Sequence, residues 1–213
     1  MPPAGYRCET EVEIKRSRFI TWLGRTDTEA EARQFIGEAR AAYPDARHHC
    51  LAYVLDEEGS PTAKNSDDGE PAGTAGTPML TSLMGADLTN VTAVVTRYFG
   101  GIKLGASGLT RAYGSCVAKA VAAMPRVARE VREVWRVDLP HRDAGRIQEE
   151  LLRSGAEVVE VSYDGDGARL RFTCRRDPIG LVAQATQGTG RPVLDGAQVV
   201  EVPIALSHDP LRT

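Results

Sequence analysis

The chain has 213 residues, a length that suits one large domain or two small ones. Hydrophobic residues make up 42% of it and charged residues 26%, which is the composition of a globular protein with a buried core. Its 26 Lys and Arg residues and 29 Asp and Glu residues give a formal net charge of −3 at pH 7. This balance excludes a polybasic tail, so any binding of nucleic acid must depend on a local patch of cations.

The cysteines and the first residues of the chain indicate a cytoplasmic protein. Residues 1–16 contain no apolar core of the kind found in secretory signals, and no apolar run of about 18 residues is present that would cross a membrane. Isolated thiols are typical of a reducing compartment, and without a Cys-x-x-Cys pair a structural zinc held by four thiolates is not expected. We expect no metal and no cofactor. The four cysteines stand far apart, at Cys8, Cys50, Cys116 and Cys174.

The first half of the chain alternates predicted strands with predicted helices. Residues 11–24 carry the apolar side chains of strands. Thr28 and Glu31 have the spacing of a capping box, and the helix that they begin is predicted to end at Pro44. Residues 47–55 are apolar on both faces, which is typical of a central strand.

A long connection then leads to the second predicted helix. Residues 56–78 are rich in Gly, Pro, Ser, Thr and acids, and the uncharged stretch 71–86 is expected to be a loop as well. Connections of this length are usually functional or disordered. Residues 91–99 form the best predicted strand, and the glycine-rich turn 100–108 leads into a helix with an apolar stripe from Leu109 to Met124.

The second half has a different order of elements. Asp164-Gly-Asp-Gly167 predicts a hairpin turn, and Asp177-Pro178 predicts a helix start. The resulting order βαββαβ is that of the ferredoxin-like split βαβ fold. The six elements are expected at 131–137, 142–153, 157–163, 168–174, 178–187 and 198–204, after a boundary near 124–129.

The glycine-rich turn is the first candidate binding site. Glycines let backbone N–H groups approach an anion, and the helix start behind them adds partial positive charge. Arg97 and Arg111 bracket the turn and Lys103 lies within it, while Ser107 or Thr110 is expected to cap the helix or donate to a phosphate. The alternative is a tight turn with exposed basic residues. The glycines taken as candidates are Gly100, Gly101 and Gly105.

The acidic segment 66–71 is the second candidate. Asp67, Asp68 and Glu70 place three carboxylates within four residues, and Thr74 follows in a glycine-rich stretch. Oxygen ligands at this density suit Mg²⁺. The alternative is that the carboxylates accept hydrogen bonds from the backbone of their own turn.

The third candidate is Arg47-His48-His49-Cys50. Strand alternation places His48 and His49 on opposite faces, so this segment does not provide the four ligands of a zinc site. A Cys–His hydrolase is disfavoured because no local partner activates the thiol. A buried or ligand-contacting His48, beside Arg47, is the preferred interpretation.

Alternation in the second half predicts a secondary basic face on its sheet. In the strand 168–174 the apolar residues are expected to face the helices and the arginines to face outward. Glu160 and Glu201 are expected at its margins, so the face would either track a phosphate backbone or hold cross-strand salt bridges. The arginines are Arg132, Arg136, Arg169, Arg171 and Arg175.

Three motifs together resemble those of the IMPACT/YigZ family in its two-domain bacterial form. They are Ser66-Asp-Asp-Gly-Glu-Pro-Ala-Gly-Thr-Ala-Gly76, Val95-Thr-Arg-Tyr-Phe-Gly-Gly-Ile-Lys-Leu-Gly105 and Leu109-Thr-Arg-Ala-Tyr113, and Arg47-His-His-Cys50 fits the same pattern. The resemblance implies an α+β chain with a ribosomal-protein-S5 domain-2-like fold over 1–126. It implies a ferredoxin-like domain similar to elongation factor G domain V over 127–213.

The family resemblance also bears on function. Eukaryotic relatives regulate translation by binding a ribosome-associated activator of a stress kinase, and the bacterial form is suspected of binding nucleic acid or ribosomes. We therefore expect a non-enzymatic protein whose partner is RNA or the ribosome. One alternative is a phosphate- or nucleotide-binding enzyme that uses the glycine-rich turn and the acidic segment. The other is a protein–protein adaptor.

Overall fold

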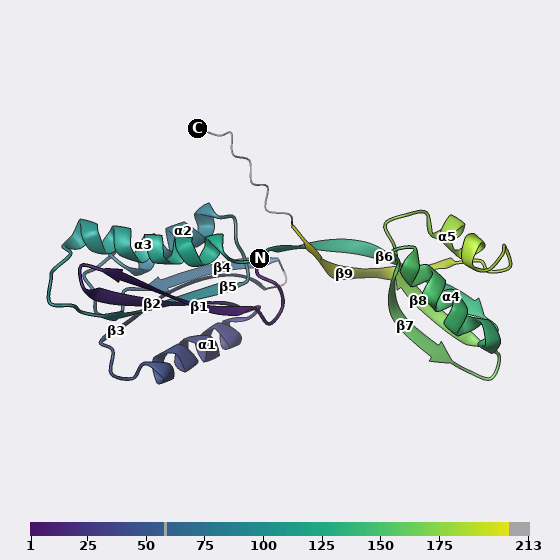
Figure 1. Ribbon diagram of the computed structural model, residues 1–213, viewed down its shortest axis with the longest axis horizontal. Coiled ribbons are helices and arrows are strands. Elements are labelled where there is room, and N and C mark those ends of the chain that lie inside the picture. Colours follow the sequence, from purple (N-terminus) through teal and green to yellow (C-terminus); the bar gives the residue numbers. More distant parts are fainter. Residues whose placement is uncertain (58, 205–213) are drawn as a thin grey trace, which may run out of the picture. The chain divides into compact units, whose positions relative to one another are not determined.

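The structure is a computed structural model that describes residues 1–57 and 59–204, and it divides the chain into two compact α+β units (Figure 1). The first unit comprises residues 1–128 together with Pro203 and Ile204, and the second comprises residues 129–202. Each unit contains one antiparallel sheet covered by helices. The predicted combination of an S5 domain-2-like and a ferredoxin-like fold is confirmed.

The first unit is a five-stranded sheet between two helical layers. Strand order is β1-β2-β5-β3-β4, so β3 is internal as its two apolar faces predict. Helices α2 and α3 cover one face and α1 the other (Figure 1). The elements are β1 (Arg7–Ile14), β2 (Ser17–Arg25), α1 (Glu29–Ala42), β3 (His48–Glu57), β4 (Ser60–Ser66), α2 (Gly76–Gly85), β5 (Val91–Tyr98) and α3 (Ala106–Ala122).

Two elements of this unit correct the sequence prediction. The segment expected to be a loop over 56–78 contains the edge strand β4, which pairs only with β3. Its sequence SPTAKNS does not alternate apolar and polar residues, because most of an edge strand of this kind is exposed to water. The stretch 71–86 contains helix α2 rather than a loop. No side chain at the N-cap position of α2 marks its start, so the local sequence lacks the usual signal.

The second unit is a four-stranded sheet with order β7-β8-β6-β9. The first and third strands are central, as the βαββαβ order predicts. Helices α4 and α5 cover one face and bury a core that includes Leu151, Leu170 and Phe172. The elements are β6 (Val127–Leu139), α4 (His141–Arg153), β7 (Glu157–Tyr163), β8 (Ala168–Thr173), α5 (Pro178–Ala185) and β9 (Val193–Pro203).

Among the described residues, no helix combines the length and the apolar character that crossing a bilayer requires.

Candidate functional site

The candidate site is a cleft of about 640 Å³ at one end of the sheet of the first unit, where β3 begins, β5 ends and α3 starts. Such a volume lies within the range of ligand-binding clefts. The acidic segment, the start of β3 and the glycine-rich turn all contribute to its walls. The lining residues are Asp45, Arg47, His48, Glu70, Pro71, Arg97, Tyr98, Phe99, Lys103, Leu104, Gly105, Ala106 and Leu109.

Asp67 holds the acidic segment against the start of α2. Its Oδ1 accepts hydrogen bonds from the backbone N–H groups of Ala75 (2.9 Å) and Gly76 (2.8 Å), and its Oδ2 accepts one from Gly73 (2.7 Å). Burial by itself raises the pKa of Asp67, but these three donors outweigh it and bring the pKa below its ordinary value. Asp67 therefore supplies the cap that α2 lacks in its adjacent sequence.

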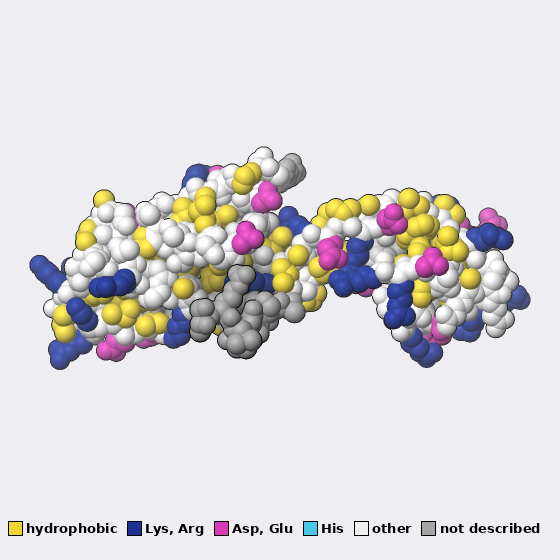
Figure 2. Space-filling view, turned by 90° about the horizontal axis from the view of Figure 1, so that it is seen from above, with side chains coloured by type: hydrophobic (Ala, Val, Ile, Leu, Met, Phe, Trp, Pro, Cys, Tyr) yellow, Lys and Arg dark blue, Asp and Glu magenta, His cyan; other side chains and the backbone are white. Residues whose placement is uncertain are grey.

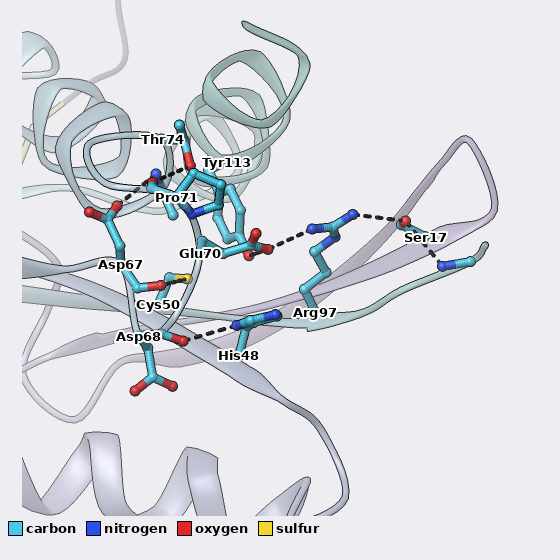
Figure 3. Close-up of polar contacts among 12 residues, drawn as sticks. Ser17, His48, Cys50, Asp67, Asp68, Glu70, Pro71, Thr74, Arg97 and Tyr113 are labelled. Atoms are coloured by element: carbon cyan, nitrogen blue, oxygen red, sulfur yellow. Dashed lines mark hydrogen bonds and ion pairs between the residues drawn. The ribbon is translucent and has the colours of Figure 1, made fainter. Parts of the chain in front are cut away.

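Asp68 ties the same segment to β3 and α1. Its Oδ2 accepts a hydrogen bond from the backbone N–H of His49 at 2.7 Å, and its Oδ1 forms an ion pair with Arg40 Nη2 at 2.9 Å. The Asp68 carbonyl oxygen lies 2.9 Å from His48 Nδ1. Figure 3 shows the Asp68 carboxylate directed away from that of Asp67.

Glu70 is the buried acceptor of the site. Its Oε1 accepts hydrogen bonds from Arg97 Nη1 at 2.6 Å and from the Tyr113 hydroxyl at 2.8 Å (Figure 3). The side chains of Glu70 and Arg97 are only 4% and 7% exposed. Burial raises the pKa of Tyr113, so its hydroxyl remains a hydrogen-bond donor. Glu70 thus links the acidic segment to β5 and α3.

The register of the sheet explains the position of Arg97. Arg97 pairs with His48 of β3 and with Phe19 of β2, so these three side chains share one face of the sheet. The guanidinium lies 5.4 Å from the ring centroid of Phe19 and 5.6 Å from that of Phe99. Its Nη2 also lies 3.4 Å from Ser17 Oγ. Arg97 was expected to meet phosphates, but in the structure it is buried and engaged by Glu70.

The three carboxylates of the acidic segment point in different directions, as Figure 3 shows. They accept hydrogen bonds from the backbone or from arginine rather than converging on one point. Within residues 1–57 and 59–204, no group of three His, Cys, Asp or Glu side chains is arranged to hold a metal ion. Asp67 fits the alternative in which the carboxylates accept hydrogen bonds from the backbone of their own turn, whereas Asp68 and Glu70 bond groups of other elements. Thr74 is also structural here, because its hydroxyl donates to the Pro71 carbonyl at 2.7 Å.

The histidines and Cys50 occupy the faces that alternation predicts. His48 reaches the cleft, while the His49 ring is buried and its Nδ1 lies 3.0 Å from Thr96 Oγ1. Cys50 Sγ donates to the Asp67 carbonyl at 2.9 Å. Burial raises the pKa of Cys50 to about 12, so its thiol stays protonated at neutral pH.

The glycine-rich turn is fixed by the neighbouring strands. The Gly100 N–H donates to Ser17 Oγ at 3.2 Å, and a Cβ at Gly100 would lie 1.9 Å from the Arg16 carbonyl oxygen. Gly105 (φ +73°) is the N-cap of α3 and provides no side-chain cap. The expectation that Ser107 or Thr110 caps the helix is wrong, because no side chain bonds the cap and Thr110 Oγ1 donates to the Ala106 carbonyl.

The start of α3, whose first backbone N–H groups have no acceptor within the helix, therefore lies at the cleft wall beside exposed cations. The first turn of α3 has no acidic residue, and Gly105 and Ala106 line the cleft. Arg47 and Lys103 are exposed lining residues, and no acidic partner is found for them in the part of the chain that the structure describes. Figure 2 shows dark-blue side chains at this end of the first unit (left in the view).

The predicted binding residues thus separate into two groups. Those on the cleft wall are Arg47, His48, Glu70, Arg97, Lys103 and Gly105. Those outside the lining are Asp68, Thr74, Gly100, Gly101 and Arg111. Arg111 is exposed on α3, and Gly101 (φ +86°) shapes the turn.

Every arginine of the secondary basic face has an acidic partner. Arg171 bonds Glu160 at 3.0 Å and Asp195 at 2.7 Å, and Arg169 bonds Asp138 at 2.8 Å. The structure favours cross-strand salt bridges over a free basic stripe. The remaining pairs are Arg132 with Glu130 and Glu157, Arg136 with Asp138 and Asp195, and Arg175 with Glu130.

Sequence reasoning missed Phe99 and the anchoring roles of Tyr113 and Ser17. Phe99 is 57% exposed and lines the cleft directly before the glycine-rich turn. An aromatic residue at the end of a strand, next to glycines and a lysine, is the signal that would have identified it. Ser17 and Tyr113 carry no such local signal, because their partners are 43 or more residues away in the chain.

Comparisons with known proteins agree with this architecture. Residues 15–121 match the family described as the Impact N-terminal domain. The chain is 43% identical over 155 residues to the IMPACT family member YvyE of Bacillus subtilis (strain 168), which covers 73% of this chain and 71% of that relative. It is 54% identical over 113 residues to YigZ of Escherichia coli (strain K12), covering 51% of this chain and 54% of YigZ.

A solved crystal structure described as that of an hypothetical protein is similar over both units. It is 35% identical to this chain, with a TM-score of 0.57, and the match covers 92% of this chain and 96% of that one.

Proposed function

The chain belongs to the IMPACT family, and from this premise we propose that it is a non-enzymatic, translation-linked protein whose cleft binds the phosphates of RNA, either free or in the ribosome. The observation that carries the proposal is the meeting of Arg47, Lys103 and the uncapped start of α3 in one cleft. Cations of this kind and helix N-termini are the groups that contact nucleic-acid backbones.

The charges of the cleft support an anionic ligand. Its two lining carboxylates are both engaged, Glu70 by Arg97 and Asp45 by the Tyr98 hydroxyl at 2.6 Å. Within the described residues, no acidic side chain forms an ion pair with Lys103 or Arg47. A phosphate entering the cleft would therefore meet these two cations without displacing an existing ion pair. Phosphates meeting the arginines of the second unit would have to displace carboxylates.

The rival enzyme hypothesis gains less support. It requires Asp68 and Glu70 to hold Mg²⁺, but Asp68 bonds Arg40 and the His49 N–H, and Glu70 bonds Arg97 and Tyr113. Both carboxylates would have to abandon buried or part-buried partners, which costs free energy. An adaptor function would use the same cleft to bind an acidic protein partner. Co-sedimentation with ribosomes over a salt series distinguishes it from RNA binding.

The test is co-sedimentation of the purified full-length protein with ribosomes, and retention on free RNA, over a series of salt concentrations. We expect retention that falls steeply with salt and is weakened by Lys103→Ala. Lys119→Ala is the matched control, because Lys119 is exposed on the same helix in its last turn, away from the cleft. Absence of any association at low salt would refute the proposal. Binding to ribosomes that neither falls with salt nor depends on Lys103 would favour the adaptor.

A further inference from the structure

We propose that Phe99 is a stacking platform for an unpaired base, so that the cleft selects a single-stranded segment of RNA. The inference rests on the proposed function, because it specifies the class of RNA that the same cleft would take. Phe99 takes no part in the proposed phosphate contacts, which involve Arg47, Lys103 and the start of α3.

The exposure of Phe99 is the first observation. Phe99 is 57% exposed although it directly follows β5, a strand that is buried almost throughout. A large aromatic side chain at the mouth of a cleft leaves apolar area in water, which a ligand with a flat apolar face would cover. A nucleic-acid base has such a face.

The second observation is that a fixed guanidinium lies beside the ring of Phe99. The Arg97 guanidinium lies over it at 5.6 Å from the ring centroid, and Arg97 is itself fixed by Glu70 at 2.6 Å. Arg97 therefore lies over one face of the ring, and Phe99 as a whole is still 57% exposed. A ring that packs beside a fixed guanidinium loses less side-chain entropy when a base stacks on it than a ring without such a neighbour.

The third observation is charge complementarity around the ring. Lys103 lies four residues beyond Phe99, and both line the cleft together with Arg47. A nucleotide joins a flat aromatic base to a phosphate, and this cleft places an open aromatic face beside cations. Single-strand-binding proteins combine these two elements. A duplex hides the faces of its bases, so a duplex would reach the cations but not the ring.

The experiment measures the affinity of the full-length protein for three probes by fluorescence anisotropy. The probes are a single-stranded oligoribonucleotide of about 12 nucleotides, the same sequence as a duplex, and inorganic polyphosphate, which has charge but no bases. The variants are Phe99→Leu, Phe99→Trp and Lys103→Ala. Tyr163→Leu is the control, because Tyr163 is a 62% exposed aromatic residue of the second unit. Circular dichroism verifies that each variant is folded.

We expect Phe99→Leu to weaken single-strand binding roughly 5- to 150-fold, the range that corresponds to one stacked base. Its affinity for polyphosphate should not change, Phe99→Trp should retain single-strand binding, and Tyr163→Leu should have no effect. Lys103→Ala should weaken binding of all three probes, because it removes a phosphate contact.

Three results would overturn the inference while leaving the proposed function intact. They are full single-strand affinity in Phe99→Leu, an equal loss for polyphosphate in that variant, and tighter binding of the duplex than of the single strand. Failure of the wild-type protein to bind any of the three probes would instead overturn the proposed function, and with it this inference.

Discussion

The Glu70 carboxylate and the Arg97 guanidinium form a buried ion pair, 2.6 Å long, at the inner wall of the cleft. The two residues are 27 positions apart and come from the acidic segment and from β5. Their pairing fixes the guanidinium against the rings of Phe19 and Phe99. The acidic segment therefore shapes the cleft, while the exposed cations at its rim remain available to a ligand.

Removing one partner of this pair should strongly destabilise the first unit. Glu70→Ala leaves the Arg97 charge buried without its carboxylate and the Tyr113 hydroxyl without its acceptor. We expect the free energy of unfolding in urea to fall by about 3–5 kcal/mol. Glu11→Ala, which breaks the exposed pair between Glu11 and Arg18, should change it little. Equal effects of the two substitutions would show that the buried pair stabilises the first unit no more than the exposed pair does.

Asp67 should make the stability of the first unit depend on pH in the acid range. Its pKa in the folded protein is lowered below the ordinary 3.8, so its stabilising effect is fully present above that value and is lost as the pH falls through the lowered pKa. Asp67→Asn removes the charge and replaces the oxygen that accepts from the Gly73 N–H with an amide NH2 group, which is itself a donor.

In chemical unfolding, Asp67→Asn should cost roughly 1–2 kcal/mol above about pH 5, a loss typical of a removed helix cap. The difference from the wild-type protein should shrink below about pH 4. Glu13→Gln is a control at an exposed acid on β1. A difference that stays constant down to the lowest pH would contradict the role of Asp67 as an ionised cap.

The thiols should differ sharply in reactivity. Cys50 and Cys116 are 0% and 1% exposed, and burial raises their pKa values to about 12 and about 11. At about pH 8 a thiol reagent should therefore label the partly exposed Cys8 and Cys174 first, and the other two only on unfolding. Peptide mapping by mass spectrometry identifies the labelled sites. Rapid labelling of Cys50 in the native protein would indicate an activated thiol and revive a hydrolase hypothesis.

The arginines of the second unit should not contribute to RNA affinity. Arg171 is held by Glu160 of the neighbouring strand β7 and by Asp195 of β9, so Arg171→Ala removes a charge that is already compensated. We expect binding of the single-stranded probe to be unchanged in this variant and weakened in Lys103→Ala. An equal loss of affinity in the two variants would show that the second unit also binds phosphates.

Periodicity and capping signals predicted most elements of the fold. Thr28 Oγ1 accepts from the Glu31 N–H at 3.2 Å, and Asp177 accepts from Ile179 and Gly180 at 3.0 Å, as the sequence indicated. These predictions succeeded because donor and acceptor lie within three residues of each other. The start of α2 was missed because its cap, Asp67, lies nine residues before Gly76.

The position of the candidate cleft was predictable from the sequence, but the contacts within it were not. The motifs indicated that the acidic segment and the glycine-rich turn are the functional segments, and the cleft lies between them. Sequence spacing could not reveal that Glu70 neutralises Arg97, because this pairing depends on how β5 is placed next to the acidic segment. For the same reason Arg97 was expected among the free cations.

The salt dependence of RNA binding tests the central claim most directly. Each phosphate contact contributes about 0.9 to the slope of log affinity against log salt concentration for duplex nucleic acid and about 0.7 for single strands. Lys103→Ala should therefore weaken binding and reduce the magnitude of the slope by about one, and Lys119→Ala should leave both unchanged. A slope in Lys103→Ala identical to that of the wild-type protein would contradict a phosphate contact at the cleft.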